Sequence, residues 1–466
     1  MRAKALAALA ITVGCVSTSI RDDLERVRAR TRLPLPNDAL SRDVDPDPAA
    51  EVRRVLSAPL TVDAAVRIAT VNNRALRATL RELGISRGRL LQAGLMPNPT
   101  FELELRYQQD RAQPLQGDVR LEFELTRMLL APVRASAARS DLEVARVRAA
   151  GAAIELGFEA RSAFLAVQAA QERLAIAQRG LDAFAAGRDA ARALFAAGNT
   201  PALDRASQEV AYETARVTVA QMELDLLDRR EALVRLLGLS GEDTGWTITD
   251  ALPPVPDAAP LSDATEARAL RASLELEVLR ARLEATARRI GLSRAEGWTP
   301  DIAVDAHGEQ DGASLEIGGG VRMSLPVFDR RQGATAAYEA EFDGMLERYH
   351  GLAIDVRSSL RETRNRVRSA HARAAQFDRV IAPARRRVVA LVLEQYNAMN
   401  LGVFQVVQAR REQLDAELAQ VETRREYWTQ LAALDALLAG WRVAGDRGDT
   451  RAAATPAAQD PARGGH

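Results

Sequence analysis

Cysteine and histidine, which are common catalytic residues and metal ligands, are sparse in this chain of 466 residues. The candidates are Cys15, His307, His350, His371, His466 and the glycines of Gly318-Gly-Gly320. A zinc centre needs several Cys, His or Glu ligands at fixed spacing, and a phosphate site needs a glycine-rich loop before a helix. Neither pattern is present, so the sequence predicts no enzyme, no cofactor and no bound metal.

The remaining chemistry lies in charged side chains that alternate with apolar ones in two pairs of short segments. Residues 101–107 and 118–125 form the first pair, and residues 302–309 and 315–327 form the second. A period of two puts apolar residues on one face of a β-strand and charged residues on the other. Strands of about nine to eleven residues cross a bilayer when tilted, so we expect transmembrane strands whose charges face a water-filled lumen. The expected lumen residues are Glu102, Glu104, Arg106, Arg120, Glu122, Glu124, Asp305, His307, Glu309, Glu316 and Arg322.

Carboxylates outnumber arginines on this expected lumen face. Rings of carboxylates favour cations in a channel, so we hypothesise a pore with a mild preference for cations. An alternative of equal weight is that the charges only keep the lumen hydrated and do not select between ions. For His307, which lies near Asp305, a solvated side chain is favoured over a passing contact with metal.

Isolated strand pairs between long helices cannot form a closed sheet by themselves. A soluble, half-buried sheet shows the same alternation, but the full charges on the polar face argue against it. Four strands are too few to close a barrel, and an open edge inside lipid leaves backbone groups without partners. If the strands span a membrane, several chains must therefore share one barrel.

A long helical segment follows each strand pair. Residues 133–200 contain no proline and are rich in Ala, Glu, Arg and Leu, which predicts roughly 95 Å of helix before a turn at residues 196–201. In the second half, a helix from Gly333 should be kinked at Pro383 and should turn at residues 397–402. The order of elements thus recurs after roughly 200 residues. The helices alone would also fit a coiled-coil scaffold or a periplasmic adaptor hairpin.

The N-terminus has the features of a bacterial export signal. Arg2 and Lys4 precede a short apolar stretch at residues 5–13, which ends at Gly14 and Cys15. A small residue before a lone cysteine resembles a lipobox, so we expect cleavage before Cys15 and lipidation of its thiol; an ordinary signal peptide is the alternative. No apolar run reaches the roughly 20 residues of a transmembrane helix, and the net charge of zero argues against nucleic acid as a partner.

Four segments resemble the TolC-like outer membrane efflux protein family. They are residues 60–69, 92–100, 325–333 and 431–441, and the resemblance covers residues 59–442 in matching order. It implies a homotrimer in which the strands of three chains make one twelve-stranded barrel in the outer membrane and the helices form a periplasmic tunnel. It also implies docking, through a periplasmic adaptor (membrane fusion protein), with an inner-membrane pump of the RND type.

The finer resemblance is to the CzcC-like heavy-metal cation-efflux branch. Residues 97–105 and 328–333 carry it, whereas residues 126–134 lack the Gly-Gly-Lys often found there. The resemblance implies an exit duct for solutes, with divalent metal cations as the favoured cargo. The alternatives are multidrug efflux or type I secretion and, from a different class, a periplasmic coiled-coil adaptor without a pore.

In this family, two aspartates often ring the closed periplasmic entrance. The matching positions here hold Gln405 and Gln408, which lack the charge of carboxylates, so an acidic gate is in doubt and Asp204 is the candidate replacement. Leu203 and Phe404 are candidates for docking or constriction, with ordinary coiled-coil packing as the alternative. The expected gate and tip residues are Gly198, Leu203, Asp204, Gly402, Phe404, Gln405 and Gln408.

The expected fold is a mixed α/β membrane channel, with a long coiled-coil α-helical barrel and a shared transmembrane β-barrel to which each chain gives four strands. Its expected parts are a signal peptide at residues 1–14, a lipidated extended segment at 15–58, efflux repeats at 59–245 and 261–442 joined by a connection at 246–260, and a disordered tail at 443–466.

Overall fold

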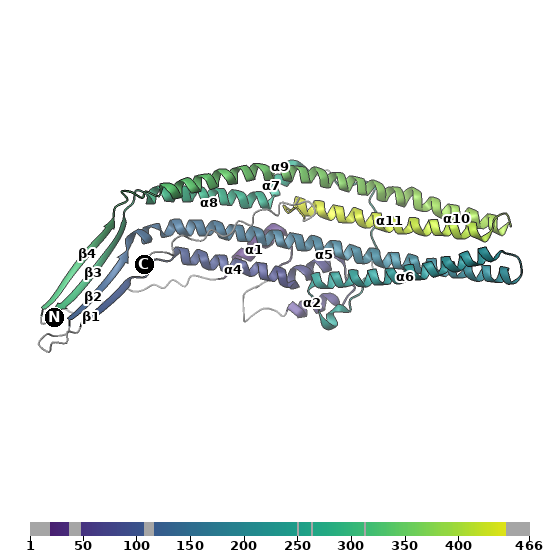
Figure 1. The fold of residues 1–466 in the computed structure, drawn as a ribbon, viewed down its shortest axis with the longest axis horizontal. Coiled ribbons are helices and arrows are strands. Elements are labelled where there is room, and N and C mark those ends of the chain that lie inside the picture. The colour runs from purple at the N-terminus through teal and green to yellow at the C-terminus, as the bar shows by residue number, and fades with distance from the viewer. Residues whose placement is uncertain are drawn as a thin grey trace.

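The computed structural model describes residues 19–36, 48–106, 116–248, 251–261, 264–311 and 314–443. Cys15, the expected signal peptide, Tyr107 and the tail from residue 444 lie outside the described residues. The helices form a long, thin bundle with the strands at one end and two helical turns at the other (Figure 1). The helices are α1 (Arg21–Thr31), α2 (Pro48–Leu56), α3 (Val62–Asn72), α4 (Arg74–Gly94), α5 (Leu125–Ala196), α6 (Ala202–Leu237), α7 (Glu266–Ala272), α8 (Leu274–Glu296), α9 (Gln332–Gln376), α10 (Ala382–Asn397) and α11 (Val403–Leu438), with a short 3-10 helix at Gly241–Thr244.

Four antiparallel strands form one sheet in the order β1-β2-β3-β4. They are β1 (Thr100–Arg106), β2 (Gln116–Glu124), β3 (Asp301–Asp311) and β4 (Ser314–Ser324), and all lie where the alternation predicted strands. Two predicted strand ends are wrong. Leu125 begins a helix, and β4 ends at Ser324 instead of Val327 because Pro326 has no N–H to donate to a ladder.

Helix α5 is continuous over 72 residues, which corresponds to about 108 Å. The predicted start at Val133 is wrong, because the helix begins eight residues earlier and runs through Pro132. Pro132 has no N–H for the carbonyl oxygen of Met128. Close by, the guanidinium of Arg134 donates to the carbonyl oxygen of Arg127 at 2.6 Å, which satisfies an acceptor beside the interrupted hydrogen-bond ladder.

The two turns at the far end of the bundle have the same construction. Residues 197–201 join α5 to α6, and residues 398–402 join α10 to α11, as predicted. Each turn contains one left-handed residue, with φ of +72° at Gly198 and +60° at Met399. In both turns the following amide donates to the carbonyl five residues earlier at 2.9 Å. This is the usual way to close a helix end, and glycine adopts it without strain.

The two halves of the chain repeat in structure. In each half a helix pair is followed by a strand pair, a long helix and a return helix. The break in each helix pair is a capping residue, which the sequence analysis did not predict. Asn73 Oδ1 accepts from the amide of Leu76 at 3.0 Å, and Ser273 Oγ accepts from the amide of Leu276 at 3.3 Å. Such caps satisfy donors that the first helical turn leaves free.

The second long helix is interrupted just before Pro383, where the sequence predicted a kink. Phe377–Ile381 form one π-helical turn, and Pro383 lies in the first turn of α10, where its missing N–H is not needed. Asp378 in this turn accepts hydrogen bonds from Gln420 and Arg424 of α11, both at 2.8 Å. The interruption is therefore fixed to the return helix.

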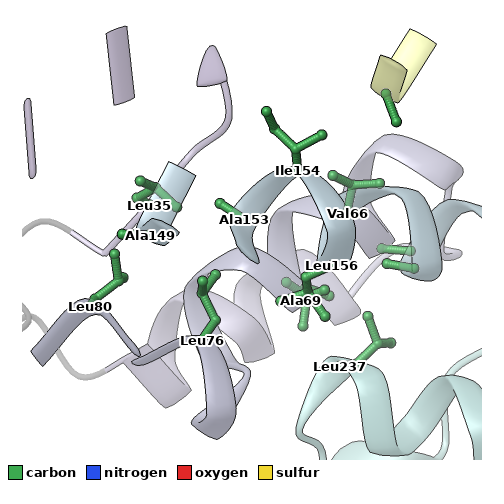
Figure 2. Close-up of a cluster of buried hydrophobic side chains, with 14 of the residues drawn as sticks. Leu35, Val66, Ala69, Leu76, Leu80, Ala149, Ala153, Ile154, Leu156 and Leu237 are labelled. Carbon is green, nitrogen blue, oxygen red and sulfur yellow. The ribbon is translucent and has the colours of Figure 1, made fainter. Parts of the chain in front are cut away.

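The main hydrophobic core surrounds the middle part of α5, from Val147 to Val167. Small side chains such as Ala149 and Ala153 lie there in one buried cluster with Leu76 and Leu80 of α4 (Figure 2). Helix α1 adds Leu24, which is 1% exposed. Close packing of this kind fixes α1 and α4 against α5. Within the described ranges, every helix falls short of the length and hydrophobicity that crossing a membrane would require.

Candidate functional site

The charged residues of the four strands share one face of the sheet. The register places Glu102 opposite Arg120, and Arg120 opposite His307. Directly paired residues point to the same side, and so do residues two positions apart along a strand. The structure thus brings all the predicted lumen residues together, while their role in a lumen stays a prediction. The charged and histidine residues of this polar face include Glu102, Glu104, Arg106, Asp118, Arg120, Glu122, Glu124, Asp301, Asp305, His307, Glu309, Glu316 and Arg322.

Asp118 belongs to this face, and the sequence analysis did not name it. It is directly opposite Glu104 on one side and Glu309 on the other, and Glu309 is opposite Glu316. These four residues form an acidic row across all four strands. The sequence carried a signal for Asp118, because it continues the period of two from Arg120. The row itself depends on the register, which the sequence analysis did not derive.

Each arginine of the polar face has a carboxylate close by. Arg322 donates to both carboxylate oxygens of Glu122, at 3.2 and 3.1 Å. Arg106 donates to Glu104 at 2.9 Å, and Arg120 approaches Glu102 to 4.0 Å. Three arginines thus face at least nine carboxylates, and the polar face has an excess of negative charge.

The opposite face of the sheet is apolar and uncovered. Phe101 and Leu103 in β1 are 64% and 53% exposed, and Ile317 and Val321 in β4 are 82% and 73% exposed. Exposed apolar surface of this extent is typical of contact with lipid or with another protein.

The predicted gate and tip residues lie on two turns at the same end of the bundle (Figure 1). Phe404 and Gln408 line a cavity of about 310 Å³ between α5, α6 and α11. Gln208, which is 2% exposed, lines the same cavity, and its Oε1 has no hydrogen-bond partner among the residues that the structure describes. Leu203 does not join them, since its side chain is 74% exposed.

The polar tip residues make local hydrogen bonds. Asp204 Oδ2 accepts from the hydroxyl of Thr200 at 3.2 Å, and Gln408 Nε2 donates to Glu412 at 2.8 Å. Gln405 is exposed beside Gly402. Within a single chain these side chains form no closed gate. In the described ranges, moreover, no group of three or more His, Cys, Asp or Glu side chains is arranged to hold a metal ion.

Comparison with known proteins agrees with this geometry. A model of the outer membrane efflux protein family matches residues 267–440. The chain is 25% identical over 391 residues to the cobalt-zinc-cadmium resistance protein CzcC of Cupriavidus metallidurans, covering 83% of this chain and 91% of that protein. Its fold is similar to a crystal structure of CusC, with a TM-score of 0.67 at 15% identity over 81% of this chain and 91% of that one. Residues 267–440 thus match the outer membrane efflux protein family, and the fold of the chain is TolC-like.

This efflux protein is an outer membrane channel of the tripartite type and extends into the periplasm. The Campylobacter jejuni channel CmeC has the same fold, with a TM-score of 0.65 at 13% identity over 87% of this chain and 91% of that one. TolC-like channels form trimers and are not enzymes. The predictions of family, fold class and localisation are confirmed, and the alternative of an adaptor without a pore is excluded.

Proposed function

We propose that this channel conducts divalent metal cations out of the cell, as a homotrimer whose three sheets close one twelve-stranded barrel. The acidic row of Glu104, Asp118, Glu309 and Glu316 is the observation that carries this proposal. Like charges directly opposite one another destabilise a sheet, so the row serves something other than stability. In a trimer it becomes a ring of carboxylates, and such rings attract cations.

The choice of metals as cargo has separate support. CzcC, whose name refers to cobalt, zinc and cadmium resistance, is similar over most of both chains. Multidrug efflux or type I secretion is the alternative, because the shared fold by itself does not specify a cargo.

Assembly from several copies is supported by a stripe on α6. Leu203, Val210, Val217 and Leu224 recur every seven residues, and each is at least 57% exposed. A heptad stripe is the seam of a coiled coil, and no helix in the described part of the chain covers this seam. Among the described residues, the edge strands β1 and β4 likewise have unpaired sides. A second copy would cover both features.

The remaining parts follow from this assembly. Lipidated Cys15 would anchor the chain, and the tips with Gly198, Asp204 and Gly402 would meet a periplasmic adaptor. That adaptor would connect the channel to an inner-membrane pump of the RND type, which would provide the energy. The two repeats, at residues 59–245 and 261–442, would each contribute one strand pair and one helical hairpin.

Survival of a gene-deletion strain tests the cargo. The strain would be grown with cobalt, zinc, cadmium, antibiotics and detergents, with and without a plasmid copy of the gene. We expect rescued sensitivity that is confined to the metals. Broad rescued sensitivity to drugs would move the chain to multidrug efflux, and labelling with a radioactive fatty acid in wild type and Cys15→Ser would test the lipid anchor.

A further inference from the structure

Asp305 and His307 form a pair on the polar face, in the middle of β3. Nδ1 of His307 lies 3.1 Å from Oδ2 of Asp305, and the side chains are 38% and 15% exposed. In the register, Asp305 is opposite Gly320 of β4 and His307 is opposite Gly318.

These two glycines make room for the pair. A Cβ atom added at Gly318 would stand 2.5 Å from Nε2 of His307, and one added at Gly320 would stand 2.5 Å from Oδ1 of Asp305. Both values are below the 3.0 Å that real Cβ atoms keep. The ends of the His307 and Asp305 side chains therefore occupy the space beside Gly318 and Gly320 that a Cβ atom would take, so any larger residue would force them to move. Gly319 between them belongs to the apolar face, and a Cβ there would make an ordinary contact of 3.4 Å.

The pair has the chemistry of a metal ligand with its orienting group. When Nδ1–H of a histidine is held by a carboxylate, the lone pair of Nε2 is free to bind a metal ion, and the carboxylate fixes the ring and raises its basicity. Imidazole nitrogen suits zinc, cobalt and their neighbours. One strong ligand, completed by water, holds an ion weakly, and a conducting pore needs weak sites that ions can leave.

The charges around the pair favour a cation. Arg120 is opposite His307 and Glu122 is opposite Asp305 in β2. Arg120 is within 4.0 Å of Glu102, and Glu122 is bonded to Arg322. Within each of these two ion pairs the opposite charges cancel. The carboxylate of Asp305 therefore remains as the uncompensated negative charge beside His307.

We infer that His307 is a transient ligand for divalent transition-metal ions on the polar face. Asp305 is its positioning residue, and Gly318 and Gly320 leave the space that the two side chains need. The inference deepens the proposed metal cargo and rests on it for its biological meaning. Each chain would thus contribute one imidazole that binds metal ions weakly as they pass through the channel.

The test has two readouts on the purified full-length protein. In planar bilayers, zinc ions should reduce the potassium current reversibly, and chelation should restore it. His307→Gln and Gly318→Ala should each raise the half-blocking zinc concentration by about tenfold or more, and Asp305→Asn by a similar factor. The matched control Gly319→Ala, on the other face of the same strand, should leave the block unchanged. Equal block in wild type and His307→Gln would overturn the inference.

The second readout does not depend on conduction. Copper(II) binds imidazole more tightly than zinc does, and its electron paramagnetic resonance spectrum reports coordinated nitrogen. In detergent-solubilised protein, His307→Gln should remove a nitrogen-coordinated copper signal that the control His350→Gln retains. If His307→Gln leaves the spectrum unchanged, His307 is not a ligand. If the wild-type protein forms no channels while the copper signal still depends on His307, the proposed channel function is contradicted. The assignment of His307 as a metal ligand is then still supported.

Discussion

The carboxylate of Asp23 in α1 is hydrogen-bonded to the guanidinium of Arg146 in α5, through Nε at 2.9 Å and Nη2 at 2.5 Å. Asp23 is fully buried and the Arg146 side chain is 9% exposed. Arg87 of α4 also approaches Asp23, to 3.6 Å. One carboxylate thus connects the N-terminal helix to two helices of the bundle.

Replacing Asp23 should destabilise the protein strongly. In Asp23→Ala the buried Arg146 guanidinium would keep only its bond to Glu143, and breaking a buried pair of this kind costs about 3 kcal/mol or more. The burial of Arg146 by itself opposes its charge, while the bonds to Asp23 and Glu143 raise its pKa, so the charge persists. Denaturant unfolding and proteolysis of α1 would measure the loss. Asp22→Ala, at an exposed neighbouring position, is the control and should behave as wild type.

Neutralising the acidic row should reduce cation preference. Asp118→Asn with Glu309→Gln removes two of its four carboxylates per chain and leaves the ion pairs of the polar face intact. We expect the reversal potential in a potassium chloride gradient to move toward zero. Glu25→Gln with Glu242→Gln changes the net charge equally at exposed positions away from the sheet, and it should have no such effect. An unchanged potential in the row variant would mean that the carboxylates only keep the surface wet.

Charges in the α6 stripe should weaken assembly. Val210 and Val217 are 66% and 57% exposed in the single chain, and burying a valine contributes about 1.5 kcal/mol or more. Val210→Glu with Val217→Glu should therefore shift trimers toward monomers in light scattering of the solubilised protein. Val210→Ile with Val217→Leu keeps the seam apolar and should keep the trimer. Trimers of normal stability in the glutamate variant would show that α6 is not at an interface.

Removing the hydroxyl of Tyr427 should alter how stability depends on pH. Tyr427 is fully buried, and its hydroxyl has no hydrogen-bond partner in the described part of the chain. Burial together with the charge of Asp435 raises the pKa of this hydroxyl. Above pH about 10 the unfolded phenol ionises while the folded one stays neutral, so this group makes folding less favourable as pH rises. In Tyr427→Phe, Tm should no longer fall as the pH rises above about 10 for this reason. At neutral pH the free energy of unfolding should increase by about 1 kcal/mol, because an unsatisfied buried hydroxyl is removed.

The matched control for this prediction is Tyr338→Phe in α9. Tyr338 is only half-buried, and its pH profile should follow wild type. A loss of stability in Tyr427→Phe at neutral pH would show that the hydroxyl has a partner that stabilises the fold.

The sequence by itself determined the elements whose signals are local. The alternation of apolar and charged residues, such as Phe101 and Glu102, is a property of neighbouring positions. This alternation predicted the location of all four strands and the two faces of each strand. The turns after Ala196 and Asn397 were likewise predicted from glycine, asparagine and proline, which stop a helix wherever they occur. The start of α5 was missed because local propensity treats Pro132 as a boundary, whereas the packed bundle tolerates it inside the helix.

Only the tertiary structure decided which distant residues meet. Asp23 and Arg146 are 123 positions apart, and nothing in either segment indicates the other. The acidic row and the position of His307 beside Gly318 depend on strand register, and a shift by one residue would have put these residues on opposite faces. Contacts of this kind arise from the packing of whole elements, so neither composition nor periodicity contains them.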